Sequence, residues 1–344
     1  MARSKRQRVF VLGAGVSATC GIAVARDLLR HSIQYLKAEN HRSQTKIIHD
    51  LLKYFYPAFD YSLKNYPNIE DFLNLIEMAK KFNSEEFIES NLWPTPKLQR
   101  AMDDTIKGVT DYIWSLMGRR KQQQRLSEFV RHHLRPGDTV VTFNWDVTLE
   151  QSLRAEPSSP KFMYTYSRKS HAHIFLLKPH GSIDWFKRKD THSLSTEKRK
   201  KLIKHDEQIY CYPEVRLDRL RELAEVAPVI VPPVSAKSFD EYPFLKKTWR
   251  NVFRAVSDAT EIHFVGYSLP KEDQFARFVL RRAMRANILK AKLNNSELPK
   301  VVVTNPDLSV EQTFSSMVGR DVSRFRYNQA LFEDLVANYK SLTA

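Results

Sequence analysis

The sequence predicts an α/β fold: a Rossmann-like, doubly wound parallel sheet with a large helical insertion. Short apolar runs alternate with segments of helical periodicity, as expected when crossover helices join the strands of a parallel sheet. One run leads directly into a glycine-rich turn, Gly13-Ala14-Gly15, and several others end in small or polar residues. Ligands of open α/β sheets bind beyond the carboxyl ends of the strands, so these residues are candidates for a site.

The length of 344 residues and the apolar content of 42% are sufficient for one large α/β domain with insertions. We expect a single domain over residues 1–344. It is interrupted by a helical insertion at about 38–125 and by a smaller, charged insertion at about 186–227.

Composition argues against several classes of protein. No apolar run approaches the roughly 20 residues of a membrane span. The apolar run 9–12 that follows the basic start is too short for a signal-peptide core, so we expect a cytoplasmic protein without membrane contact. Only Cys20 and Cys211 occur, and they form no Cys-x-x-Cys pair. We therefore expect no metal site.

The chain is strongly basic, with a formal net charge of +16 from 55 Lys and Arg against 39 Asp and Glu. The basic residues cluster in the runs 5–8, 119–121, 198–201 and 281–282. Such a surface attracts polyanions, including nucleic acid, or an acidic partner. Each run taken alone is explained more simply as a solvated face.

The first strand is expected at residues 8–12 and the first helix at 22–36, with the glycine-rich turn between them. In a strand, phosphate-loop and helix unit, glycines let the backbone approach a pyrophosphate, and N–H groups at the helix start stabilise its charge. The alternative is a tight strand-to-helix turn without a ligand. The insertion then contains expected helices at 47–56, 68–82 and 97–117, and another helix is expected at 122–134.

The central stretch is 142–146, where the apolar run 139–143 ends in Asn144 and Asp146. A strand in this position delivers both side chains to a crevice. The alternative is an Asx turn that caps the following helix, expected at 147–153, because Asn and Asp favour such positions. The stretch alone favours neither interpretation.

Similar polar ends recur along the rest of the chain. A strand at 174–178 precedes His180-Gly181-Ser182, where the glycine leaves the imidazole ring accessible, although a turn histidine is the alternative. One short strand is expected at 208–212, and the run 229–231 is expected to return the chain to the main sheet. The remaining expected elements are a helix at 242–259, a strand at 261–265 before Gly266 and Ser268, a helix at 272–288, a strand at 300–304 before Asn305, and a strand-helix pair at 324–339.

Taken together, the strand ends resemble the sirtuin family. The run Gly13-Ala14-Gly15-Val16-Ser17, followed by Gly21 and Arg26, is similar to the family's phosphate loop. The other matching motifs follow in family order: Thr142 to Asp146, His180-Gly181-Ser182, Gly266-Tyr267-Ser268-Leu269 and Thr304-Asn305. The resemblance implies a sirtuin-like Rossmann-type domain that uses NAD as its substrate.

The chain also departs from the family pattern. Ala23, Val24 and Ala25 replace Pro-Asp-Phe in the cofactor loop, Phe143 replaces a Gln, and the four-cysteine zinc module is absent from the sequence. The stretch 68–73 resembles a segment of bacterial sirtuin-like defence proteins. Those proteins resemble NAD glycohydrolases that deplete NAD during phage infection, some with a HerA-like ring ATPase or an Argonaute as partner.

The resemblance and the residues together predict an NAD glycohydrolase acting in prokaryotic anti-phage defence, without a metal and as a homo-oligomer. The alternatives are an NAD-dependent protein deacylase and a catalytically silent nucleotide-sensing module. The predicted catalytic residues are Asn144 and His180, because cleavage of the nicotinamide–ribose bond requires a held ribose, a placed water and a proton acceptor. The predicted cofactor-binding residues are Gly13, Ala14, Gly15, Ser17, Arg26, Asn144, Asp146, Gly266, Ser268 and Asn305.

Overall fold

The structure, a computed structural model, describes residues 7–60, 62–84, 92–117, 123–156, 158–167, 172–188, 190–200, 202–204, 208–211, 226–231, 243–319 and 324–343. Within these residues, seven parallel strands form the main sheet, in the order β11-β10-β9-β1-β2-β4-β3. The strands are β1 (Arg8–Leu12), β2 (Thr139–Thr142), β3 (Phe162–Met163), β4 (Ile174–Leu177), β9 (Glu261–Val265), β10 (Lys300–Thr304) and β11 (Phe325–Asn328). The predicted parallel sheet is therefore confirmed.

The order of the strands creates a topological switch point beside β1. The chain first adds β2, β4 and β3 on one side of β1, and then crosses to the other side to add β9, β10 and β11. In register, Val11 of β1 pairs with Val141 of β2 and Phe264 of β9. At this point the loops that follow neighbouring strands turn to opposite faces of the sheet. They diverge, and a crevice forms at the carboxyl ends of the strands.

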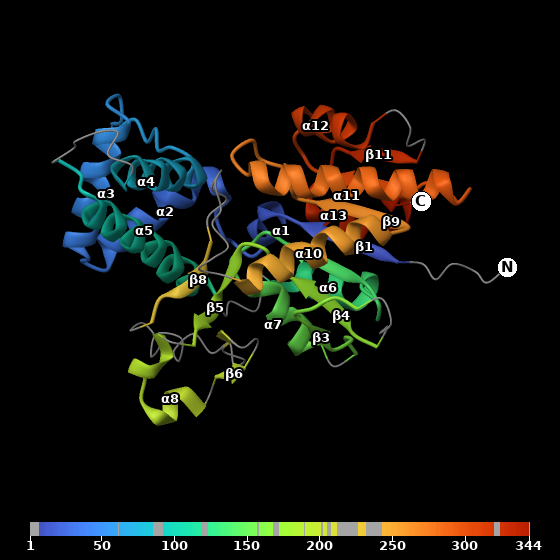
Figure 1. Cartoon of the computed structure of the whole chain (residues 1–344), viewed down its shortest axis with the longest axis horizontal. Helices are drawn as coiled ribbons and strands as arrows, with labels where there is room; N and C mark the ends of the chain where they lie inside the picture. The colour runs from blue at the N-terminus through green and yellow to red at the C-terminus, as the bar shows by residue number, and fades with distance from the viewer. Residues whose placement is uncertain are drawn as a thin grey trace.

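Helices cover both faces of the sheet because alternate strand residues point in opposite directions. Val9 and Val11 join a buried cluster with α10 (Pro243–Asp258), α11 (Gln274–Leu293) and α12 (Ser309–Val318). Phe10 and Leu12 join another with α6 (Gln124–His133), α7 (Thr148–Ala155) and α13 (Phe332–Ala337). Figure 1 shows α10 and α11 crossing in front of the strands. The chain ends in the short helix α14 (Tyr339–Thr343).

A separate helical lobe lies beside the sheet, to the left in Figure 1. It consists of α2 (Ala25–Ala38), α3 (Arg42–Phe55), α4 (Ile69–Ser84) and α5 (Thr95–Leu116), which share one buried cluster. Helix α5 approaches α2 closely at Gly108, where an added Cβ would lie 2.7 Å from a methyl carbon of Leu36. Helix α2 therefore packs as part of the same lobe as the helices of segment 38–125.

The first helical segment differs from the prediction of one helix at 22–36. A five-residue helix, α1 (Ala14–Ala18), comes directly after β1, and α2 begins only at Ala25. The reason is a bend between them: Gly21 has a φ of +81°, and the N–H groups of Cys20 and Ile22 both donate to the carbonyl oxygen of Ser17. The sequence interpretation therefore missed α1, which lies within the predicted turn, and began the long helix three residues too early. Strand β3 and helix α12 were also not predicted.

A second sheet corrects the prediction that residues 229–231 return to the main sheet. In the described residues it is antiparallel, in the order β6-β7-β5-β8, and consists of β5 (Gly181–Lys187), β6 (Ile203–Lys204), β7 (Ile209–Cys211) and β8 (Pro228–Ile230). Strand β8 pairs with β5, which the sequence interpretation had divided at residue 186. Strand β5 was difficult to predict because its apolar residues do not alternate simply with polar ones. Ile183, Trp185 and Phe186 are all buried.

Two short helices, η2 (Asp190–Ser193) and α8 (Thr196–Lys200), lie between β5 and β6. The predicted strand 208–212 is present as β7, and its last predicted residue, Tyr212, lies outside the described residues. The basic run 119–121 and the first half of the run 5–8, Lys5 and Arg6, lie outside them as well.

Gly181, which follows His180, and Gly319 have similar backbone conformations but different surroundings, so comparing them shows why residue 181 is a glycine. Both have positive φ, +81° and +80°. A Cβ at residue 181 would lie 2.0 Å from the carbonyl oxygen of Val229, whereas a Cβ at residue 319 would meet none of the described residues within 4 Å. The pairing of β5 with β8 thus requires a glycine after His180, a reason that the sequence interpretation did not include.

We predict that Gly319→Ala lowers the free energy of unfolding by about 1 kcal/mol, the cost of a left-handed backbone for a residue with a Cβ. Gly181→Ala is expected to lower it by about 3 kcal/mol, because overpacking against the Val229 backbone is added to that cost. Denaturant unfolding of the two variants measures both values. Equal losses would show that the contact with β8 does not constrain residue 181.

Candidate functional site

A cavity of about 420 Å³ opens at the carboxyl ends of β1, β2, β9 and β10, at the switch point of the sheet. Its far wall comes from the helical lobe, through residues 22–26, 68–70 and 113. The volume lies within the usual range for ligand sites. All residues that the sequence predicted for the site line this one cavity: Gly13, Ala14, Gly15, Ser17, Arg26, Asn144, Asp146, His180, Gly266, Ser268 and Asn305.

The floor of the cavity is a backbone contact between the loops that follow β1 and β9. The N–H of Gly13 donates to the carbonyl oxygen of Val265 at 3.0 Å, and the N–H of Gly15 donates to that of Gly266 at 2.9 Å. A Cβ on Gly13 would lie 2.5 Å from the Gly266 carbonyl oxygen, and one on Gly15 would lie 2.8 Å from the Gly266 Cα. The three glycines are therefore needed for this contact whether or not a pyrophosphate binds.

This contact also limits which groups are able to hold a phosphate. The N–H groups of Gly13 and Gly15 are already used, so a pyrophosphate here depends on other donors. Ser268 and Arg26 line the cavity and are exposed. The Arg26 side chain is 81% exposed and lies 3.7 Å from Asp27, so it is free to reorient towards an anion.

Asn144 is held by its amide nitrogen. Its Nδ2 donates to the carbonyl oxygen of Gly13 at 2.9 Å and to Ser17 Oγ at 2.7 Å, which uses both of its protons. The remaining polar atom of the side chain, Oδ1, is an acceptor. Asn144 is therefore oriented to accept a hydrogen bond from a hydroxyl group or a water molecule in the cavity.

Asp146 supports this arrangement from below. Its Oδ2 accepts the Ser17 hydroxyl at 2.6 Å, and its Oδ1 accepts both the N–H (3.0 Å) and the hydroxyl of Thr148. The contact with the Thr148 N–H is the Asx turn that the sequence left as an alternative, at the start of α7. Asp146 therefore forms this turn and also lines the cavity together with Asn144, so the two interpretations of the central stretch do not exclude each other.

His180 lies in an aromatic enclosure at the same cavity. Its ring meets Phe143 edge to face, with 5.0 Å between ring centroids, and tilts against Trp249 at 5.9 Å. Phe143 in turn stacks on Tyr267. On another side, His180 Nε2 lies 2.9 Å from Asp273 Oδ2. Burial and the charges of Asp273 and Glu70 raise the pKa of Tyr267 well above its usual value, so its phenol stays protonated.

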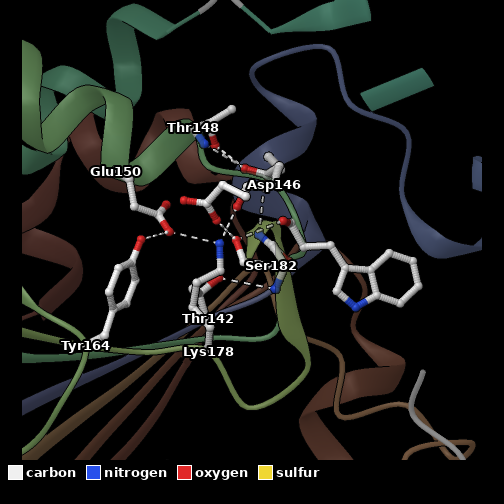
Figure 2. A network of polar contacts seen from close by, with 11 residues as sticks. Thr142, Asp146, Thr148, Glu150, Tyr164, Lys178 and Ser182 are labelled. Atoms are coloured by element: carbon white, nitrogen blue, oxygen red, sulfur yellow. Dashed lines mark hydrogen bonds and ion pairs between the residues drawn. The ribbon is translucent and has the colours of Figure 1, made fainter. Parts of the chain in front are cut away.

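Behind the cavity, a buried lysine ties the loop after β2 to the end of β4 (Figure 2). Lys178 Nζ donates to the main-chain oxygen of Asp146 at 2.6 Å and to Glu150 Oε1 at 2.9 Å. The side chains of Lys178 and Glu150 are 0% and 1% exposed. Tyr164 adds a hydrogen bond to Glu150 at 3.2 Å. An ammonium group stripped of water is strongly destabilising unless such partners surround it.

Asp184 is a second carboxyl group near this lysine, and it accepts the Ser182 hydroxyl. Burial, together with the charge of Glu150, raises the pKa of Asp184 to about 6, although Lys178 and the Ser182 hydrogen bond act in the opposite direction. The cluster contains one ammonium and two carboxyl groups, so a protonated Asp184 makes it neutral. A proton on Asp184 is therefore part of the stable form of the cluster at mildly acid pH.

Sequence analysis missed three residues of this site. Lys178 closes an apolar strand, which is a signal that its charge is buried, but nothing local indicates its partners. Asp273 precedes a helix and would be taken for an ordinary N-cap. Glu70 lines the cavity from the helical lobe, although the sequence interpretation placed it in the first turn of a helix and assigned it no further role.

No three His, Cys, Asp or Glu side chains come together as metal ligands would in the part of the chain that the structure describes. The expectation of a metal-independent site remains a prediction. Among the described helices, none is long and apolar enough to cross a membrane.

Comparison with known proteins adds little. No protein-family model matches the chain, and no curated protein matches it. Solved structures that align over 98% of it include Sir2 in complex with the inhibitor EX-527, 2'-O-acetyl-ADP-ribose and a deacetylated p53 peptide, at 14% identity over 93% of that chain with a TM-score of 0.38. Another is Sir2Tm bound to a propionylated peptide, at 13% identity over 94% of that chain with a TM-score of 0.37. Similarity at this level carries no argument about activity, which rests on the site itself.

The raised pKa of Asp184 predicts a specific dependence of stability on pH. The folded protein holds this proton more tightly than the unfolded chain, whose Asp has a pKa of 3.8. Its contribution to stability is therefore complete below that value and is lost as the pH rises towards about 6. Asp184→Asn removes the titrating group and keeps an acceptor for Ser182.

As the pH rises from 5 to 8, the wild type is expected to lose about 1 kcal/mol of unfolding free energy that Asp184→Asn keeps. The difference between the two proteins therefore grows with pH. Denaturant unfolding of both proteins across this range measures the difference. A difference that does not change with pH would mean that Asp184 is ionised throughout.

Proposed function

We propose that this chain is an NAD⁺ hydrolase that cleaves the bond between nicotinamide and ribose. The observation that carries the proposal is the convergence of Asn144 and His180. They follow neighbouring strands, β2 and β4, and line one cavity with the glycine-rich loop after β1. An oriented acceptor, Asn144, and a potential base, His180, thus lie in a site of the size and position expected for a nucleotide ligand.

The reaction consumes water: NAD⁺ and H₂O give nicotinamide, ADP-ribose and a proton. The carbon–nitrogen bond breaks with its electron pair going to nicotinamide, which leaves as a neutral molecule and needs no acid. An oxocarbenium-like centre develops on the ribose, and the oxygen of water bonds to it. The chain has to hold the ribose, place the water and accept one proton.

Each of these tasks has a residue in the cavity. Asn144 Oδ1 accepts from a ribose hydroxyl or from the attacking water, because its amide protons are already used by Gly13 and Ser17. His180 takes the proton released by the water or by a ribose hydroxyl. Ser268, Arg26 and Asn305 surround the cavity where the phosphates and the second ribose of a dinucleotide would extend.

Two alternatives use the same cavity. A protein deacylase has to exclude water and present an acyl-lysine carbonyl to the ribose. Here Ala25 lines the cavity in the position where the family resemblance calls for a Phe, and the small side chain favours access of water. A silent nucleotide-sensing module is the other alternative. The convergence of Asn144 with a buried His–Asp pair supports catalysis over binding alone.

The biological role that best fits this activity is depletion of NAD during phage infection of a prokaryotic cell. This rests on the resemblance of the segment 68–73 to bacterial sirtuin-like defence proteins, and this segment contributes Asn68, Ile69 and Glu70 to the cavity wall. A cytoplasmic enzyme that destroys NAD requires control. We therefore propose that it acts as a homo-oligomer or with a partner such as a HerA-like ring ATPase or an Argonaute, and that its basic surface contacts nucleic acid.

Incubation of the purified protein with NAD⁺ tests the function, with nicotinamide and ADP-ribose measured by chromatography. Asn144→Ala and His180→Ala are each expected to lower the rate about 10²–10⁴-fold, the usual effect of losing a base or positioning group. His132→Ala is the matched control, because this histidine is exposed and does not line the cavity. A variant at Asn144 or His180 that is folded and turns over like the wild type would remove that residue from the mechanism.

A second experiment separates hydrolysis from deacylation. Since water reaches the ribose in the proposed mechanism, nicotinamide release is expected without any peptide. An acylated lysine peptide is expected neither to accelerate release nor to yield an acyl-ADP-ribose, as followed by mass spectrometry. Release that strictly requires the peptide would identify the protein as a deacylase.

A further inference from the structure

A contact between His180 and Asp273 joins the loop after β4 to the start of α11. His180 follows β4 and Asp273 precedes α11, so the fold brings together two residues that are distant in sequence. His180 Nε2 and Asp273 Oδ2 lie 2.9 Å apart, and the two side chains are only 4% and 1% exposed. The pair is thus shielded from solvent at the wall of the cavity.

The Asp273 carboxylate is fixed independently of the histidine. Its Oδ1 accepts the N–H of Ala276 at 3.1 Å and so caps the N-terminus of α11. With one oxygen held by the helix, the other lies 2.9 Å from the imidazole Nε2. The positive end of this 20-residue helix also favours the charged form of a carboxyl group placed there.

A helix cap alone does not explain an aspartate in this place. Asn or Ser caps a helix as well as Asp does, and neither carries a charge that has to be buried. A buried carboxylate is strongly destabilising unless a cationic or hydrogen-bonding partner compensates it. The partner at 2.9 Å is a group that becomes cationic when it accepts a proton.

We propose that Asp273 is the positioning residue of His180. In this pair the carboxylate accepts a hydrogen bond from the Nε2–H and thereby selects the tautomer in which Nδ1 is unprotonated. In the reaction, the proton from water or from a ribose hydroxyl moves to Nδ1, and Asp273 stabilises the resulting imidazolium without being protonated itself. The catalytic consequence rests on the proposed NAD⁺ hydrolysis, whereas the choice of tautomer does not.

The aromatic neighbours of His180 complete the arrangement. Phe143 and Trp249 restrict the ring on two sides, so that the contact with Asp273 decides which nitrogen carries the proton. The Tyr267 phenol, which also lines the cavity, stays neutral because burial and the charges of Asp273 and Glu70 raise its pKa. Asp273 is therefore the carboxylate in direct contact with the ring.

Asp273→Asn and Asp273→Ser test the proposal, because both side chains keep an oxygen that is able to cap α11. Neither provides a carboxylate to His180. With NAD⁺ as substrate, kcat is expected to fall about 10²–10⁴-fold in both variants. KM and the Kd of ADP-ribose are expected to change less than about threefold, because Asp273 touches the histidine and not the ligand. Unchanged kcat in well-folded variants would show that Asp273 is only a helix cap.

Nitrogen NMR of ¹⁵N-histidine-labelled protein gives a readout that does not depend on catalysis. The His180 signals, identified by their loss in His180→Gln, are expected to show the Nε2–H tautomer in the wild type. In Asp273→Asn they are expected to shift to the Nδ1–H tautomer, because the Asn amide donates towards Nε2. The same tautomer in both proteins would overturn the proposal. If the wild type proves inactive on NAD⁺, the proposed function fails while this measurement still decides the tautomer.

Discussion

The site depends on the buried ammonium of Lys178. Its hydrogen bonds to the Asp146 carbonyl and to Glu150 join the loop after β2, helix α7 and the end of β4 behind the cavity. Asn144 lies two residues before Asp146, and His180 lies two residues after Lys178, so one cation fixes the distance between the two predicted catalytic residues. Because the Lys178 side chain is 0% exposed, breaking either contact leaves a buried charge without full compensation, which is strongly destabilising. The geometry of the cavity is thus coupled to the stability of the fold.

A second constraint is the contact of the two glycine-containing loops. Gly13 and Gly15 pack on Gly266 at distances that exclude any Cβ, and their N–H groups bind the loop after β9. This contact closes the floor of the crevice that the strand order opens at the switch point. The helical lobe then supplies the facing wall through α2 and α4. The contact of the glycine-containing loops and the helical lobe therefore enclose a site at the edge of a parallel sheet of common architecture.

Local patterns in the sequence were sufficient for six of the seven described strands of the main sheet and for the polar residues at their ends. Apolar runs fix the strands, and polar residues after them meet at one edge because parallel strands align their carboxyl ends. What local patterns do not contain is pairing between distant segments. Strand β5 was missed because its partners β7 and β8 decide its structure. Lys178 and Asp273 were missed as site residues because their roles depend on Glu150, Asp146 and His180. Helix α1 was missed because its five residues are too few to show an apolar periodicity.

We propose that the cavity at the switch point binds NAD with its reactive ribose between Asn144 and His180. A crystal structure of the protein with ADP-ribose tests it most directly. We predict that the terminal ribose contacts Asn144 Oδ1 and lies beside the His180 ring, that Arg26 turns towards the pyrophosphate, and that the adenosine extends towards Asn305. ADP-ribose bound elsewhere, or with its terminal ribose directed away from both residues, would contradict the account.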